Sequence, residues 1–311
     1  MAGPGHPHSH PHHGARSGGR TLAGALLITA GFAVIEALGG WLAGSLALLG
    51  DAGHMITDAT ALGLATLAAW ISRLPPTRRH SYGLQRAEII AALINGLFML
   101  GVVSAIVVSA IDRLETPRPV HGAAVIGVAG LGLLVNLGVA WLLARGEHTL
   151  NVRGALLHVI GDVLGSVAAL ASGLVVYTTG WLPIDPLLSL LICVLILYSA
   201  VRLLWDVMHV IMEGVPRHLD LADVGRAMAA VAEVREVHDL HIWTLSSGVI
   251  ALSAHVVIDD LGRWDAVLER LRTLLETQYG IGHITLQPEP AAQVIQPMAR
   301  RDRRAGRQTP P

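Results

Sequence analysis

The 311-residue chain has one cysteine, no lysine and few charged residues. Cys193 alone cannot support a disulfide framework or a cysteine-rich zinc fold. Charged residues make up 14% of the chain, whereas a soluble domain carries about 25%. So few charges cannot cover the surface of a soluble protein of this size. The composition therefore argues against a cytosolic enzyme and for a protein surrounded partly by lipid.

The chain also lacks a large net charge, since its formal charge at pH 7 is -1. A nucleic acid is therefore not an expected partner. In contrast, the sequence contains 16 histidines. Because neutral imidazole is a common metal ligand, this excess makes divalent metal ions the expected partners.

Long apolar stretches dominate the first two thirds of the chain, and turns rich in glycine, proline and arginine separate them. A helix needs about 20 apolar residues to cross the hydrocarbon core of a membrane. The sequence therefore predicts a bundle of six membrane-spanning helices over residues 21–207, with lipid around it. The expected spans are 21–43, 46–72, 87–111, 120–144, 150–178 and 185–207.

Both ends of the chain lack apolar periodicity and are predicted to be disordered, over residues 1–20 and 291–311. The first segment is rich in glycine, proline and histidine. Two interpretations of its histidines stay open, a low-complexity tail and a loose metal-collecting arm. These histidines are His6, His8, His10, His12 and His13.

Arginine placement predicts the orientation in the membrane. Arginines gather in residues 1–20, 73–86 and 145–153, which lie on alternate sides of the predicted spans. Arginine-rich connections stay on the cytoplasmic side of a membrane. We therefore expect a multi-pass protein, in a bacterial inner membrane, with both termini in the cytoplasm.

Residues 208–290 have the composition of a small soluble α/β domain. Helical periodicity over 220–234 and 264–279 alternates with apolar strands, giving the order αββαβ in two layers. The expected strands are 237–245, 249–258 and 281–287.

Two of the predicted spans contain the same spacing, His54-x-x-x-Asp58 and His158-x-x-x-Asp162. Residues four apart share one face of a helix, so each pair can point at one object. Two such helices facing each other offer two imidazoles and two carboxylates, a set suited to tetrahedral zinc. A local hydrogen bond is the alternative for either pair alone. Ionisable groups are costly inside a membrane, however, and the repeated spacing favours one shared metal site.

These ligands also suggest a driving force. A histidine or carboxylate must lose its proton to bind a metal ion, so binding expels protons near neutral pH. We therefore hypothesise that metal export is coupled to proton uptake. Among the other polar residues of the spans, Asp51 lies near the same face as Asp58, and three more are expected to make helix–helix contacts. These three are Glu36, Asn95 and Asn136.

The soluble domain holds a second set of candidate ligands. Residues three apart on a regular strand face opposite sides, so only one of His238 and His241 can join a given site. Regulatory zinc sites and ordinary surface histidines both remain open. The candidates are His238, His241, His255, His283 and Glu289, with His80 as a candidate for a separate interfacial site.

Several motifs together resemble the cation diffusion facilitator family of metal transporters, in its zinc/cadmium efflux branch. They are GSLALLGDAGHMITD at 44–58, HSYG at 80–83, RAE at 86–88, HVIGD at 158–162, VHDLHIW at 237–243 and TLQ at 285–287.

The resemblance covers about residues 21–290 and implies proton-coupled zinc efflux, with cadmium as a further substrate, by a homodimer. It also implies that the soluble domain is cytoplasmic and metallochaperone-like, and that His54, Asp58, His158 and Asp162 form the transport site. Leu84 and Pro288 stand where some members place a metal ligand, so the other sites are expected to differ.

Two other functions compete with a carrier. A membrane-embedded metalloenzyme needs an open metal position and a general base, as in His-Glu-x-x-His, which the sequence does not contain. A passive divalent-metal channel uses similar ligands, and the sequence alone does not separate it from a carrier.

Overall fold

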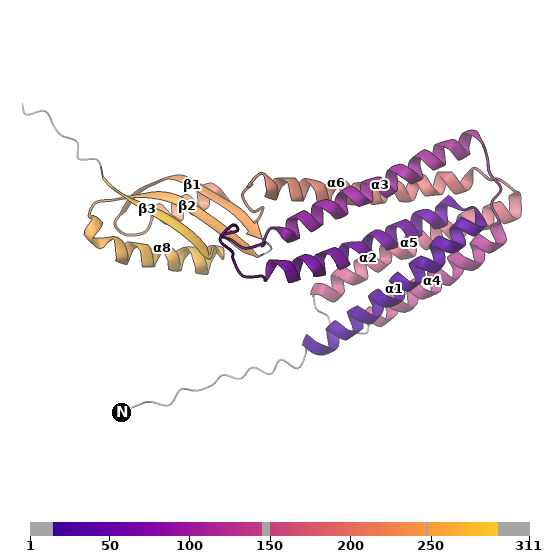
Figure 1. The fold of residues 1–311 in the computed structure, drawn as a ribbon, viewed down its shortest axis with the longest axis horizontal. Coiled ribbons are helices and arrows are strands. Elements are labelled where there is room, and N and C mark those ends of the chain that lie inside the picture. Colours follow the sequence, from indigo (N-terminus) through magenta and orange to yellow (C-terminus); the bar gives the residue numbers. More distant parts are fainter. Residues whose placement is uncertain (1–14, 145–149, 247, 292–311) are drawn as a thin grey trace, which may run out of the picture. The chain divides into compact units, whose positions relative to one another are not determined.

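A computed structural model describes residues 15–144, 150–246 and 248–291 (Figure 1). The chain divides into two compact units, Met1–Met212 and Glu213–Pro311. Within the described residues, the first unit consists of six helices. They are α1 (Ala15–Ala43), α2 (Leu46–Ser72), α3 (Ala87–Glu115), α4 (Gly122–Ala144), α5 (Leu150–Thr179) and α6 (Ile184–Ile211).

Each predicted span coincides with one helix, which confirms the predicted helical membrane domain. Among the residues that the structure describes, five helices are long and apolar enough to cross a membrane, and α1 contributes a shorter apolar part, Leu27–Ala43. The boundaries differ from the expected ones at both ends of the unit. Helix α1 begins at Ala15, so the end of the segment expected to be disordered is helical, and α6 continues to Ile211. The rest of that segment, with its five histidines, lies outside the described residues.

The outer surface of the bundle is apolar, as a lipid-facing surface must be. Leu134 is 68% exposed and Val108 equally so. Exposed tryptophans lie near both ends of the bundle, where aromatic rings suit the membrane–water interface. They are Trp41 and Trp181 at the end that holds the α1–α2 turn, and Trp70, Trp141 and Trp205 toward the other end.

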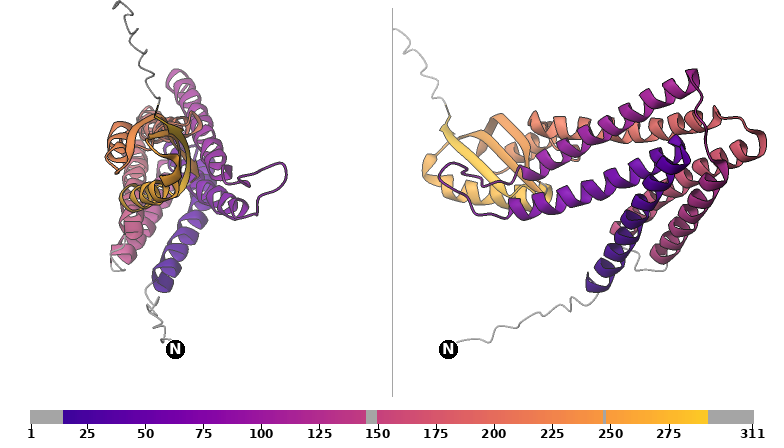
Figure 2. Two further views of the ribbon diagram at one scale, coloured as in Figure 1. Left: turned by 90° about the vertical axis from the view of Figure 1, so that its left-hand side faces the viewer. Right: turned by 45° about the vertical axis from the view of Figure 1, so that its right-hand side comes forward.

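The helices converge at the end of the bundle that holds the α1–α2 turn. Figure 2 shows α1 and α4 diverging from α3 and α6 with distance from this end. Gly44 makes the turn with a positive φ of 69°, and a Cβ at this position would lie 2.8 Å from the carbonyl oxygen of Pro119. The backbone amide of His121 also donates to the carbonyl of Ala43 at 2.9 Å. This tight packing joins the α1–α2 turn to the segment between α3 and α4.

The second unit has a three-stranded sheet with helices, which confirms the predicted α/β order. Its elements are α7 (Leu221–Ala229), β1 (Val234–Ser246), β2 (Val249–Ile258), η1 (Leu261–Arg263), α8 (Trp264–Tyr279) and β3 (His283–Pro290). The sheet order is β1-β2-β3, with β1 and β2 antiparallel and β2 and β3 parallel. Helix α7 ends before its expected limit at 234, because the chain turns there into a longer first strand.

One face of this sheet forms the core of the unit. Val256 and Ile258 of β2 are buried against Val224 of α7 and Leu271 of α8. Because side chains alternate along a strand, the residues between them face the opposite side of the sheet. His255, which alternates with the core residues Ala254 and Val256, lies on that second face.

Candidate metal centre

The first candidate site lies between α2 and α5. His54 and Asp58 are one turn apart on α2, and the distance from Nδ1 of His54 to Oδ2 of Asp58 is 3.3 Å. Asp162 of α5 is completely buried. One ligand atom from each of these three side chains lies within 4.8 Å of the other two. The structure therefore brings together three of the four residues that the sequence predicts as metal ligands.

The fourth predicted ligand, His158, belongs to α5 one turn before Asp162. Its side chain lies outside the described part of the structure. The spacing of four residues places it on the same helical face as Asp162. Imidazole nitrogen and carboxylate oxygen are ligands that zinc accepts in a four-coordinate site.

A buried chain of hydrogen bonds lies beside this site and connects α2, α5 and α4. The Ser166 hydroxyl, one turn after Asp162, donates to Oδ2 of Asp51 at 3.1 Å. The Asn136 amide in turn donates to the Ser166 hydroxyl at 3.1 Å. Asn136 thus makes the expected helix–helix contact. The Asn95 amide donates to the sulfur of Met99, one turn later in α3.

The approach of α2 to α5 at this level depends on Gly165. A Cβ added to Gly165 would lie 2.1 Å from Oδ1 of Asp51, which is far inside van der Waals contact. Asp51 is 1% exposed, so its carboxylate cannot avoid this contact by moving into solvent. The small residue therefore permits the spacing between the two ligand-bearing helices.

The second candidate site lies on the outer face of the sheet and takes one residue from each strand. Nε2 of His238 lies 3.1 Å from Oε2 of Glu289, and Nδ1 of His255 lies 2.8 Å from Oε1 of Glu289. His238 and His255 are register partners on β1 and β2, with ring centroids 5.2 Å apart. Ligand atoms of all three residues lie within 4.8 Å of one another. We call these three residues the sheet cluster.

The remaining candidate ligands do not join either group among the described residues. His241 contacts Asp239 at 3.0 Å across a register shift in β1, where Asp239 has a positive φ of 50°. His283 starts β3, away from the sheet cluster. Nδ1 of His80 lies 3.4 Å from the hydroxyl of Thr77 in the connection between α2 and α3. The structure therefore gives His80, His241 and His283 no part in a described metal-binding group.

Comparison with protein families matches the chain over nearly its full length. Residues 22–212 match the cation efflux transmembrane domain. Residues 216–291 match the cytoplasmic domain of cation efflux proteins. The chain belongs to the cation efflux family, the cation diffusion facilitators. Membership places this cation efflux protein among transporters and not among enzymes, and it confirms the resemblance that the motifs indicate.

Bacterial relatives share most of its length. The zinc transporter ZitB of Escherichia coli is 44% identical over 91% of both chains. The metal cation efflux system protein CzcD of Cupriavidus metallidurans is 39% identical, covering 93% of this chain and 91% of its own. The cadmium, cobalt and zinc/H(+)-K(+) antiporter of Bacillus subtilis is 38% identical, covering 88% and 89% respectively.

Sequence reasoning missed Ser166 and Gly165 as neighbours of the site in this cation efflux protein. Ser166 follows Asp162 by four residues, and Gly165 immediately precedes Ser166. The i to i+4 spacing places Ser166 on the ligand face of α5. Serine and glycine are common in membrane helices, so this spacing alone does not predict that Ser166 and Gly165 lie against Asp51.

Proposed function

We propose that this cation efflux protein exports zinc from the cytoplasm in exchange for protons, with cadmium as a further substrate. The transport site consists of His54, Asp58, His158 and Asp162. The convergence of His54, Asp58 and Asp162 from two membrane helices carries the proposal. The names of relatives support it, since ZitB is a zinc transporter and the Bacillus subtilis protein is a proton-linked antiporter.

The chemistry of the ligands accounts for the exchange. Zinc binds the deprotonated forms of histidine and carboxylate, so each zinc that binds displaces protons from the site. Protons that bind on the far side of the membrane in turn displace zinc. A site that alternates between the two sides thus couples zinc export to proton uptake.

The same proposal includes the setting of the protein. The arginine-rich connections and the second unit lie in the cytoplasm, two chains form a homodimer, and the protein resides in a bacterial inner membrane. The match to a cytoplasmic domain model and the bacterial relatives support this setting.

Reconstituted protein tests the coupling. In proteoliposomes with an acidic lumen, a zinc-sensitive dye inside should report zinc accumulation above the external concentration. Collapse of the pH gradient with a protonophore should stop this accumulation. Zinc that only equilibrates, at the same rate with and without the gradient, would establish a passive channel and contradict the proposal.

We also propose that the sheet cluster is a regulatory zinc site. His255→Ala should lower the zinc bound per full-length chain by about one ion, because His255 contacts Glu289 and neighbours His238. The measurement is equilibrium dialysis in an Asp58→Ala, Asp162→Ala background, which removes the transport site. His283→Ala is the matched control, since this histidine is in the same sheet but outside the cluster. Equal losses in the two variants would disprove a defined site.

A further inference from the structure

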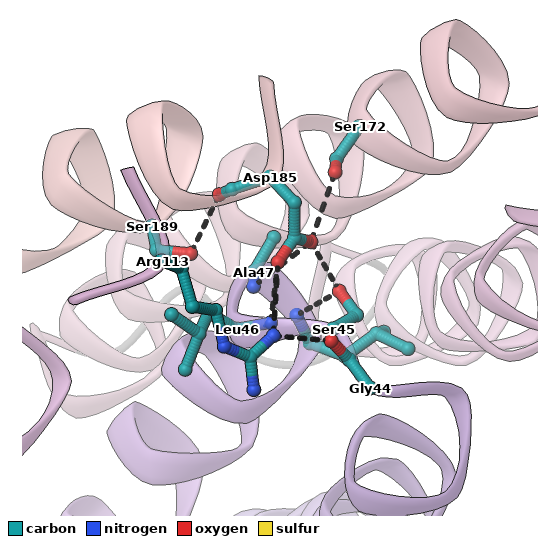
Figure 3. Close-up of polar contacts among 9 residues, drawn as sticks. Gly44, Ser45, Leu46, Ala47, Arg113, Ser172, Asp185 and Ser189 are labelled. Carbon is teal, nitrogen blue, oxygen red and sulfur yellow. Dashed lines mark hydrogen bonds and ion pairs between the residues drawn. The ribbon is translucent and has the colours of Figure 1, made fainter. Parts of the chain in front are cut away.

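A buried carboxylate lies at the end of the bundle where the helices converge. Asp185 is in the first turn of α6 and is completely buried. Figure 3 shows its side chain among groups from the start of α2, from α5 and from α3. Its backbone carbonyl also accepts from the hydroxyl of Ser189 at 2.7 Å, within α6.

The strongest contacts of Asp185 go to the start of α2. Its carboxylate accepts from the backbone amides of Leu46 at 2.6 Å and Ala47 at 3.3 Å. The hydroxyl of Ser45, the N-cap residue of α2, donates to it at 2.5 Å. The first amides of a helix have no partner inside the helix, and they favour negative charge. Asp185 thus fixes the first turn of α2 from another helix.

The same carboxylate also contacts α5 and α3. The Ser172 hydroxyl of α5 donates to Oδ1 of Asp185 at 3.0 Å. Nη1 of Arg113 in α3 lies 3.8 Å from Oδ2 and donates to the carbonyl of Gly44 in the α1–α2 turn. One side chain of α6 therefore connects α2, α3 and α5.

Helix capping alone does not explain this arrangement. Ser45 already caps α2 from within, since its hydroxyl accepts from the amide of Leu48 at 3.2 Å. A fully buried carboxylate at the edge of a membrane is costly unless its partners compensate the lost hydration. In addition to capping α2, Asp185 fixes the distance between α2, α5 and α6.

Two of the helices that Asp185 joins, α2 and α5, carry the proposed metal ligands. His54 follows the start of α2 by about 12 Å along the helix, and Ser172 follows Asp162 by about 15 Å, at a rise of about 1.5 Å per residue. We propose that Asp185 is a positioning residue for the transport site, which holds α2 against α5 so that their ligands meet around one ion. This inference rests on the proposed zinc transport through that site.

The test is zinc transport by Asp185→Asn in proteoliposomes, with KM and the maximal rate measured separately. The amide has nearly the same shape but no charge, and one of its two acceptor atoms becomes a donor facing the amides of α2. We expect KM for zinc to rise about tenfold, the size of effect typical when a residue that orients metal ligands is lost. The maximal rate per folded protein should stay within about twofold of wild type, because the ligands themselves remain.

Asp112→Asn is the matched control. Asp112 lies near the same end of the bundle, but it is half-exposed and pairs with Arg118 at 2.7 Å. Its replacement removes the same charge without touching α2 or α5, so KM should not change. If Asp185→Asn folds poorly, Ser172→Ala removes one donor from the same carboxylate and should raise KM by a smaller factor.

The two levels of the proposal fail differently. Absence of zinc transport by the wild-type protein would refute the proposed function. Normal transport by the wild type, with an unchanged KM in both Asp185→Asn and Ser172→Ala, would refute the positioning role. A loss of maximal rate per folded protein at constant KM would show that Asp185 acts on a step other than zinc binding, and it would also refute the positioning role.

Discussion

Replacement of Asp162 by alanine should abolish zinc transport without unfolding the protein. Asp162 is completely buried, and in the proposed transport site its carboxylate would supply one of the negative charges that face the ion. Loss of a residue that merely supports a metal ligand costs about 10- to 100-fold in affinity. Loss of a ligand should cost at least about 100-fold, by the same comparison. Asp58→Ala should have the same result, because its carboxylate shares the site.

Asp162→Ala should leave the stability of the folded protein unchanged or raise it. Burying a carboxylate in a membrane is costly, so its removal relieves the protein of an unfavourable group. Thermal unfolding in detergent should therefore occur at the wild-type temperature or above it. Asp112→Ala is the control, since it removes an exposed carboxylate from the same unit and should leave transport intact. Zinc flux by Asp162→Ala near the wild-type rate would overturn the assignment of the site.

Gly165→Ala should produce the second largest loss of transport. The new methyl group would overlap Oδ1 of Asp51, and this buried carboxylate cannot move into solvent. Either the Asp51 side chain or the helices α2 and α5 must then shift. A shift of the side chain disturbs its hydrogen bond from Ser166, and a shift of the helices draws Asp162 away from His54. Overpacking of this kind typically costs about 1–3 kcal/mol of stability. Alanine by itself favours a helix over glycine by about 1 kcal/mol, so a destabilised variant would identify the steric contact as the cause.

A second glycine makes this experiment specific. Gly63 lies in α2, and a Cβ there would meet no atom within 4 Å. Gly63→Ala should therefore keep full zinc transport and a wild-type or higher unfolding temperature. If both alanine variants behave alike in flux and melting measurements, the close approach at Gly165 is not what sets the spacing of the helices.

Local spacing explains why much of the transport site could be predicted. His54 and Asp58 must share a helical face, whatever the rest of the fold does, and the same holds for His158 and Asp162. The convergence of α2 and α5 needed the repeated spacing as a clue, because no local rule pairs two helices. The contacts of Ser166, and those of Asp185 with Ser45, depend on how helices far apart in sequence pack. For that reason the sequence contained no sign of them.

In the sheet cluster, too, the pairing of strands decided what the sequence pattern of a single strand could not. Alternation along a regular strand predicts opposite faces for His238 and His241, and this prediction is wrong. Their partners on β2, His255 and Ser253, are two residues apart, so the register shift in β1 places both histidines on one face, although only His238 joins the cluster. The register shift between these residues could not be foreseen, because it depends on how β1 pairs with β2. The parallel pairing of β3 likewise decides that Glu289 joins the cluster and His283 does not.

The short turns near Asp185 restrict how the bundle can open on that side. Gly44 and Ser45 alone join α1 to α2, and residues 180–183 join α5 to α6. A residue reaches at most about 3.6 Å, so the two-residue turn keeps α1 and α2 together at this end of the bundle, and the four-residue turn limits how far α5 and α6 can part. The turns therefore restrain separation within each pair more than separation between the pairs. The carboxylate of Asp185 lies between these two pairs, and its hydrogen bonds to Ser45 and Leu46 link them at this end of the bundle.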